Sequence, residues 1–193
     1  FVVKEVQRLT RSEGFQLGDC AVMYRINAQS RAFEEACLRY GIKYKLVGGI
    51  RFYQRKEVKD LMAYLRLVHN PRDEVSLNRV INVPARGIGK KTLDQLAYLA
   101  RSRGISLYDA LKLVAQEPGG NHGLGGRAAQ PLVHFSRLMD ELTEASQRLD
   151  VVELIDLVLE RTSYRQYILE QPQGEERWEN IMELRGTAQE FRD

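Results

Sequence analysis

The stretch Asn82–Leu93 constrains the fold of this chain most, because one helix must end and another must begin within it. Pro84 cannot continue a helix, and Gly87 and Gly89 are poor helix formers that permit a sharp turn. After the second glycine, apolar residues recur at the spacing of an amphipathic helix. Ile88 can anchor the turn by packing between the flanking helices. The sequence therefore predicts two helices joined by a Gly-Ile-Gly turn.

The charges at the start of the second helix are unusual. Helix N-termini favour Asp and Glu, yet Lys90 and Lys91 stand here, shortly after Arg86. Free backbone N–H groups, the positive end of the helix dipole and basic side chains together describe a binding site for phosphate. The alternative is an ordinary turn between helices whose lysines are merely solvated. The local pattern leaves both interpretations open.

The composition is that of an ordinary soluble globular protein, with 44% hydrophobic and 28% charged residues. The 193 residues can form one large domain or two small ones. No apolar run reaches membrane-spanning length, no signal peptide opens the chain, and the first residue, Phe1, indicates a piece cut from a longer protein. The few cysteines and histidines predict a cytoplasmic location, no disulfide framework and no structural metal. These residues are Cys20, Cys37, His69, His122 and His134.

The small net charge of +3 hides an asymmetry along the chain. Residues 1–100 hold 18 Lys and Arg against 10 Asp and Glu, whereas residues 101–193 hold 11 against 16. The balances are therefore +8 and −5. A basic front half is what a surface that binds a polyanion requires. The alternative is scattered, solvated charge, because the excess is moderate.

The expected secondary structure divides the chain in two. Apolar runs of strand length lie at 20–24 and 44–47, with a helix over 28–40 between them. This order predicts a small α/β fragment over residues 1–49. From Arg55 onward the periodicity predicts helices only, in a mainly α domain over residues 50–193. Other helical stripes are expected at 2–9, 58–68, 75–81, 93–100, 110–114, 132–142, 151–159 and 176–191.

The first candidate site follows the first predicted strand. In open α/β layers, ligands collect outside the carboxyl ends of the strands, which is where Arg25 and Asn27 lie and where Gln29 and Arg31 open the next helix. Arg can clamp a phosphate, and Asn can bond a phosphate, a sugar or a base edge. The alternative is structural: Asn27 caps the helix, and Arg31 pairs with Glu34 or Glu35. From these residues alone the structural interpretation is favoured.

Two further stretches carry weaker signals. Residues 49–57 interleave aromatic and basic side chains, which suits contact with nucleic acid, but a packed hinge is favoured. Gly123–Arg127 is a weak echo of the Gly-Ile-Gly turn; it can be a second turn that presents its backbone, but a loop is favoured. The chain has no G-x-x-x-x-G-K-[ST] loop for a nucleotide and no Ser/His/Asp trio, so no catalytic centre is predicted.

Three stretches taken together resemble the UvrD/PcrA/Rep family of superfamily I DNA helicases. The resemblance runs nearly continuously from Phe1 to Leu111 and continues to Arg177-Trp178-Glu179-Asn180, which is similar to a family Arg-x-Glu-Asn segment. The stretches are Ala21–Arg31, Val47–Asp60 and Val80–Gly89.

This resemblance implies a location within a larger enzyme. Residues 1–49 look like the latter part of the RecA-like motor domain 2A, and residues 50–193 look like the helical 2B domain with a helix-hairpin-helix-like turn. The parent would hydrolyse ATP with Mg²⁺ to move 3′ to 5′ along DNA, whereas this chain lacks the ATPase motifs, is expected to be inactive alone and binds no cofactor itself. Expected partners are a single-strand/duplex DNA junction, the rest of the motor and repair proteins, with no membrane.

The resemblance also assigns roles to residues. Single-stranded DNA would be bound by Arg25, Asn27, Gln29 and Arg31. The duplex backbone would be held, without sequence preference, by Arg86, Gly87, Ile88, Gly89, Lys90, Lys91 and Thr92. Two other functions stay open: a stand-alone helix-hairpin-helix DNA-binding module, and a protein-docking or autoregulatory domain.

Overall fold

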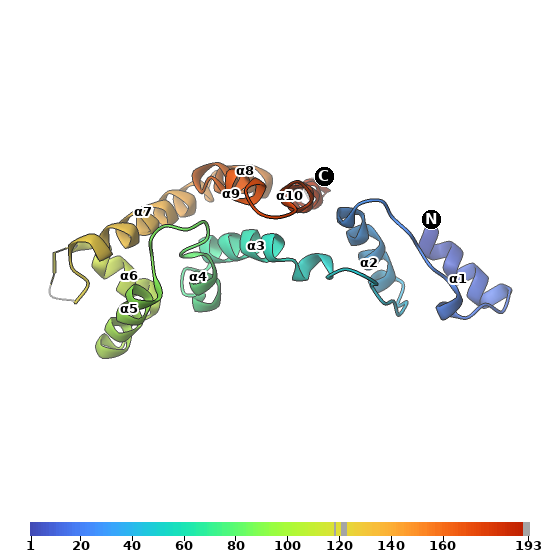
Figure 1. Ribbon diagram of the computed structural model, residues 1–193, viewed down its shortest axis with the longest axis horizontal. Helices are drawn as coiled ribbons and strands as arrows, with labels where there is room; N and C mark the ends of the chain where they lie inside the picture. The colour runs from blue at the N-terminus through green and yellow to red at the C-terminus, as the bar shows by residue number, and fades with distance from the viewer. Residues whose placement is uncertain (118, 121–122, 191–193) are drawn as a thin grey trace.

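The computed structural model describes residues 1–117, 119–120 and 123–190. Its architecture is mainly α, as predicted (Figure 1). The α-helices are α1 Val2–Ser12, α2 Ser30–Arg39, α3 Lys56–His69, α4 Glu74–Val80, α5 Lys90–Arg103, α6 Leu107–Gln116, α7 Ala129–Ala145, α8 Val151–Arg161, α9 Tyr164–Leu169 and α10 Gly174–Glu190. Short 3₁₀ turns are η1 Leu17–Asp19, η2 Asn27–Gln29, η3 Phe52–Gln54 and η4 Gly126–Ala128.

Local sequence signals explain where several helices begin. Ser106 caps α6 by accepting a hydrogen bond at its Oγ from the Asp109 amide at 3.0 Å, as Ser favours the N-cap position. Asp150 caps α8 in the same way through the amides of Val152 and Glu153. The short helix α9 was not predicted. The predicted helix end at Phe191 lies outside the described residues.

The predicted α/β character of residues 1–49 is wrong for this chain. Residues 20–24 and 44–47 form no strand in the part of the chain that the structure describes. Much of their apolar surface is open to solvent, including Met23 and Val47. A strand is stabilised by a hydrogen-bonded neighbour, and neither segment has one here. The residue pattern fits a strand, but residues 1–117, 119–120 and 123–190 supply no partner strand.

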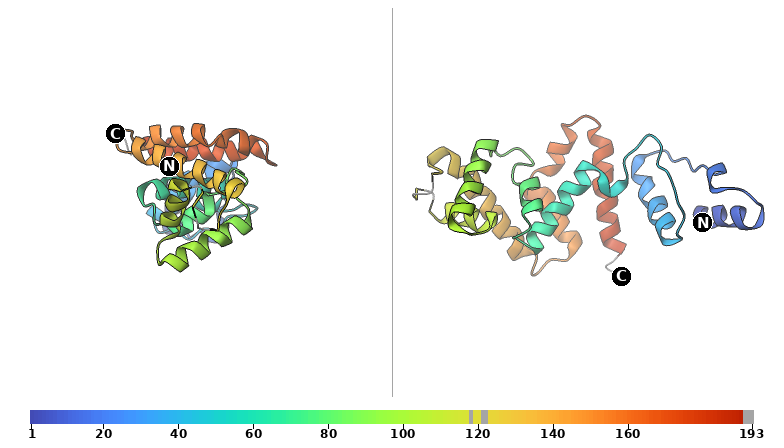
Figure 2. Two further views of the ribbon diagram at one scale, coloured as in Figure 1. Left: turned by 90° about the vertical axis from the view of Figure 1, so that its left-hand side faces the viewer. Right: turned by 90° about the horizontal axis from the view of Figure 1, so that it is seen from below.

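The helices form an elongated molecule (Figures 1 and 2). The helices α1 and α2 lie at one end, α5, α6 and α7 lie at the other, and α3 and α10 lie between them. The chain enters the helical part through α3 and ends along α10, and these two helices pack against each other. No helix within the described residues combines the length and apolarity required to span a membrane.

A single hydrophobic core runs through residues 52–184. It begins at Phe52, which is completely buried, and includes members of every helix from α3 to α10. No described residue before Phe52 belongs to it. The first 49 residues therefore contact the helical body mainly through polar groups. Phe52 is packed, as the interpretation of residues 49–57 predicts, whereas Tyr53 is exposed and the charged Arg55 and Glu57 are buried.

Candidate nucleic-acid interface

The predicted turn between helices forms between α4 and α5. Gly87 adopts a left-handed backbone with φ 78°, which a side chain would strain, and Gly89 is extended and stands at the N-cap of α5. Ile88 is only 1% exposed and belongs to the core. The Asn82 Oδ1 atom accepts hydrogen bonds from the amides of Arg86 at 2.7 Å and Ile88 at 3.2 Å. One buried anchor and one asparagine side chain thus hold the turn.

The start of α5 offers donors and positive charge to solvent. No side chain caps this helix and no acidic residue stands in its first turn. Among the described residues, no group accepts a hydrogen bond from the amides of Lys90, Lys91 or Thr92. The Lys90 and Lys91 side chains are exposed and form no ion pair within the described part of the chain. Free N–H groups, the helix dipole and two ammonium groups therefore face the same solvent.

Arg86 does not belong to this exposed group. Its Nη1 atom donates to the carbonyl oxygens of Val80 and Pro84, at 3.0 and 3.1 Å, and its Nη2 atom donates to the Tyr64 hydroxyl at 2.5 Å. The guanidinium also lies 5.3 Å from the ring centroid of Phe135. Because its N–H groups donate to acceptors inside the protein, Arg86 stabilises the turn from its buried side.

A second turn repeats this backbone geometry at the start of η4. Gly123 has φ 75°, Leu124 is 1% exposed, and Gly125 is extended with φ −89° and ψ 150°. The two turns lie close together, since the Gln95 side chain of α5 donates to the Gly123 carbonyl at 3.5 Å. The shared Gly-aliphatic-Gly spacing indicates this turn in the sequence, although a loop is the favoured interpretation there. The backbone agrees with the alternative of a second turn.

Of the other candidate residues, Arg25 and Asn27 line a shallow hollow of about 300 Å³ between the loop before α2 and the start of α10, whereas Gln29 and Arg31 do not. Arg25 is exposed. The Gln29 Oε1 atom accepts from the amides of Arg25 and Ile26, at 3.1 and 3.4 Å, so this side chain shapes the loop. The Asn27 side chain donates to the Glu176 carboxylate rather than capping a helix. The hollow is lined by Tyr24, Arg25, Ile26, Asn27, Glu176 and Glu179.

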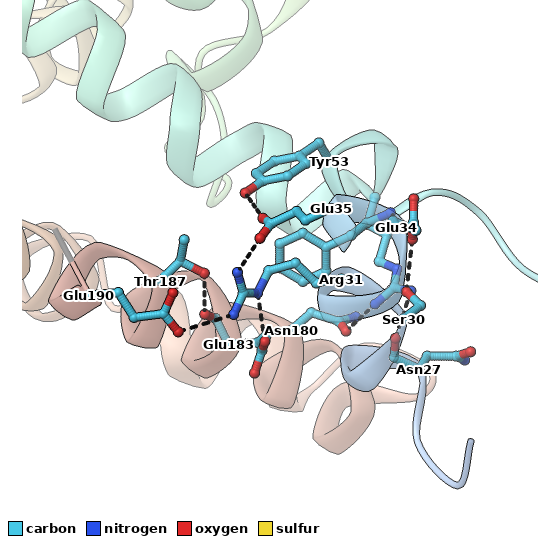
Figure 3. Close-up of polar contacts among 12 residues, drawn as sticks. Asn27, Ser30, Arg31, Glu34, Glu35, Tyr53, Asn180, Glu183, Thr187 and Glu190 are labelled. Carbon is cyan, nitrogen blue, oxygen red and sulfur yellow. Dashed lines mark hydrogen bonds and ion pairs between the residues drawn. The ribbon is translucent and has the colours of Figure 1, made fainter. Parts of the chain in front are cut away.

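The buried Arg31 side chain forms ion pairs with three carboxylates that remain partly exposed (Figure 3). Its guanidinium contacts Glu183 at 2.6 Å, Glu35 at 2.8 Å and Glu190 at 3.5 Å, and its side chain is only 8% exposed. Burial alone would lower the pKa of Arg31, but the bonds to Glu183 and Glu35 outweigh it and raise the pKa. The pairing with Glu35 is one of the structural alternatives considered above. This guanidinium joins α2 to α10.

One protein family matches the chain over its whole length. The model of the family described as "UvrD-like helicase C-terminal domain" matches residues 1–193. The chain belongs to this family.

Individual relatives of this UvrD-like domain are DNA helicases. The chain is 37% identical over 193 residues to the ATP-dependent DNA helicase PcrA of Bacillus subtilis, 41% identical to DNA helicase II of Haemophilus influenzae and 42% identical to the ATP-dependent DNA helicase UvrD1 of Mycobacterium tuberculosis. In each comparison 99% of this chain is aligned. The chain spans about a quarter of the length of these relatives, namely 25%, 26% and 25%.

Within this UvrD-like domain, the two predicted residue sets lie far apart. The loop before α2 and the turn before α5 lie on opposite sides of α3 along the length of the molecule (Figure 1). The sequence analysis assigned no role to Arg55, whose buried side chain reaches the loop, although Arg55 lies within the stretch Val47–Asp60 of the resemblance. It also missed the role of Asn180, which binds Arg55.

Proposed function

We propose that this chain is a DNA-binding part of an ATP-dependent DNA helicase that moves 3′ to 5′ in the cytoplasm. ATP and Mg²⁺ are bound by other parts of the enzyme. Residues 1–49 belong to motor domain 2A, and residues 50–193 form domain 2B. The domain holds the duplex ahead of the junction and regulates unwinding. Membership of the helicase family supports this proposal.

The duplex contact is carried by one observation: the unpaired amides at the start of α5 lie beside the exposed Lys90 and Lys91. Backbone amides and lysines bind phosphate oxygens without reading bases, so this contact is independent of sequence. Thr92, in the same first turn, adds a hydroxyl. The nearby turn at Gly123–Gly125 has the same backbone form and supports a second grip on the duplex.

The single-strand contact is assigned to the loop before α2. Arg25 supplies an exposed guanidinium, and Asn27 lines the same hollow. Gln29 and Arg31 serve the contact indirectly, because Gln29 shapes the loop and Arg31 anchors α2 to α10. Binding here requires the strand to displace Glu176 from Asn27. We therefore expect weaker binding at this site than at the turn.

The double substitution Lys90→Glu with Lys91→Glu tests the duplex contact. Each lost phosphate contact lowers the slope of log K against log salt by about 0.9, so we expect the slope to fall by about 1.8 and affinity at low salt to fall by roughly tenfold or more. The measurement is fluorescence anisotropy of a labelled duplex with a single-stranded tail, titrated at several salt concentrations.

The matched control is Lys4→Glu with Arg11→Glu, which changes the net charge equally on exposed positions of α1, at the far end of the molecule. An equal loss of affinity in both variants would mean that only net charge matters. No loss in either would leave the protein-docking function as the better account. The stand-alone alternative is tested by the surrounding reading frame, since a helicase requires a G-K-[ST] loop upstream.

A further inference from the structure

Arg55 is a buried cation at the junction between the two parts of the chain. It stands directly before α3, is 7% exposed, and its guanidinium lies 5.3 Å from the ring centroid of the buried Phe52. A buried guanidinium is costly unless its N–H groups are bonded to acceptors. Its acceptors therefore show which parts of the fold it holds together.

The acceptors of Arg55 come from three segments. Nη2 donates to the Asn27 carbonyl and to the Ser30 hydroxyl, both at 2.8 Å. Nη1 donates to the Asn180 Oδ1 atom of α10 at 2.5 Å, and Nε donates to the Ile50 carbonyl at 3.3 Å. One side chain thus joins the loop of the single-strand site to the start of α3 and to α10.

Neutral groups extend these contacts to carboxylates. The Ser30 hydroxyl donates to Glu34 at 2.9 Å, and the Asn180 Nδ2 atom donates to Glu57 of α3 at 2.7 Å. Arg55 forms no direct ion pair with a carboxylate in the described part of the chain. The Asn180 amide therefore has a set orientation, with its oxygen toward Arg55 and its nitrogen toward Glu57. Figure 3 shows Asn27, Ser30, Glu34 and Asn180 in this region.

We infer that Arg55 is a positioning residue that transmits movements of α3 and α10 to the Asn27–Arg31 segment. The chain enters the helical part at α3 and runs back along α10, so a displacement of the helical body moves both helices. The hydrophobic core stops at Phe52, so the loop is held by the burial of Ala28 and by its polar bonds. What the loop binds rests on the proposed function, but the coupling does not.

Hydrogen–deuterium exchange of the intact chain tests the coupling without DNA. Arg55→Lys keeps the charge but cannot serve acceptors in several directions at once. We expect exchange at residues 27–31 to rise about tenfold, while exchange at the start of α5 stays unchanged. The matched control is Arg86→Lys, which should raise exchange at residues 82–92 and leave the loop unchanged, because Arg86 supports that turn.

Asn180→Asp tests the transmission at a distance. Aspartate still accepts from Arg55 but cannot donate to Glu57 and adds a like charge beside it. We expect exchange at residues 27–31 to rise about threefold, and this rise to vanish in the Arg55→Lys background. This single variant decides the question should Arg55→Lys fail to fold. Unchanged exchange in the loop, or an equal rise at α5, would overturn the inference.

A DNA-binding measurement separates this inference from the proposed function. Arg25→Ala should weaken binding of a labelled single strand, and Arg55→Lys should weaken it while leaving duplex affinity intact. No effect of Arg25→Ala would overturn the single-strand assignment, whereas the exchange result would still stand. The positioning role would be overturned by a different result. In that case Arg25→Ala weakens single-strand binding, whereas Arg55→Lys changes neither single-strand binding nor hydrogen exchange at residues 27–31.

Discussion

Individual arginines and lysines have different tasks in this protein. The guanidinium groups of Arg31, Arg55 and Arg86 are satisfied by internal acceptors, whereas Lys90 and Lys91 face solvent. This division follows from chemistry, since the planar fork of Arg satisfies several acceptors at once and the strongly hydrated ammonium of Lys stays at the surface. A count of basic residues therefore overstates the charge available to DNA.

The buried hydroxyl of Tyr64 makes the stability of the protein depend on pH. It is completely buried, and its hydroxyl donates to the Val83 carbonyl and accepts from Arg86. Burial raises the pKa of Tyr64 to about 12 from its ordinary value of 10, against an opposing effect of the nearby Arg86. A phenol with a raised pKa in the folded state stabilises the protein below pH 10 and loses this contribution as the pH rises toward 12.

We therefore expect Tyr64→Phe to lower the free energy of unfolding by about 1–2 kcal/mol at neutral pH. The difference in free energy of unfolding between the two proteins should fall by roughly 2 kcal/mol between pH 10 and 12, so that it vanishes or changes sign. Urea unfolding at a series of pH values measures it. A gap that stays constant over that range would contradict the assignment.

Among the elements, the start of α5 depends on backbone conformation. The backbone at Gly87 has a left-handed conformation, which disfavours any residue with a side chain. Space does not limit a substitution there, because a Cβ would lie 3.9 Å from the Pro131 side chain. Gly186, in α10, has open space around the Cβ position and no left-handed backbone. The two glycines therefore have opposite consequences for stability.

We expect Gly87→Ala to lower the free energy of unfolding by about 1 kcal/mol because of backbone strain. Gly186→Ala, its matched comparison, should raise stability by roughly 0.5–1 kcal/mol because alanine favours the helix. Chemical denaturation of both variants measures the difference. Equal effects of the same sign would mean that the turn conformation is not required.

At the scale of the whole molecule, a polar seam attaches the first 49 residues to the helical body. It consists of the contacts of Asn27 and Arg31 with carboxylates of α10. Arg31 is its centre, because its side chain is 8% exposed and contacts Glu183 and Glu190 of α10. Arg8 also contacts two carboxylates, but these are its neighbours Glu5 and Glu13, and its side chain is 50% exposed. Solvent screening makes such exposed pairs weak.

Arg31→Met should therefore lower the local stability of α2 by roughly 2–3 kcal/mol, because the buried guanidinium and its charged hydrogen bonds to Glu35 and Glu183 are lost. Arg8→Met should change the stability of α1 by less than about 0.5 kcal/mol. Limited proteolysis and hydrogen exchange over residues 1–49 distinguish them. Indifference of α2 to Arg31→Met would show that another contact carries the seam.

The sequence by itself determined the helices from α3 to α8, the capping of α6 by Ser106 and the turn around Ile88. These depend on hydrogen bonds between residues a few positions apart and on apolar periodicity, so the information is local. The motif pattern also determined the family, since it is a property of the sequence alone.

Only the tertiary structure decided which charged residues are available. Arg31 meets Glu183 across 152 positions, and Arg55 meets Asn180 across 125, separations that no local pattern encodes. Residues 20–24 and 44–47 form no strand within the described part of the chain for the same reason. A strand requires a hydrogen-bonded partner strand from elsewhere in the sequence. Burial and ion pairing are decided by contacts that form only when distant segments meet.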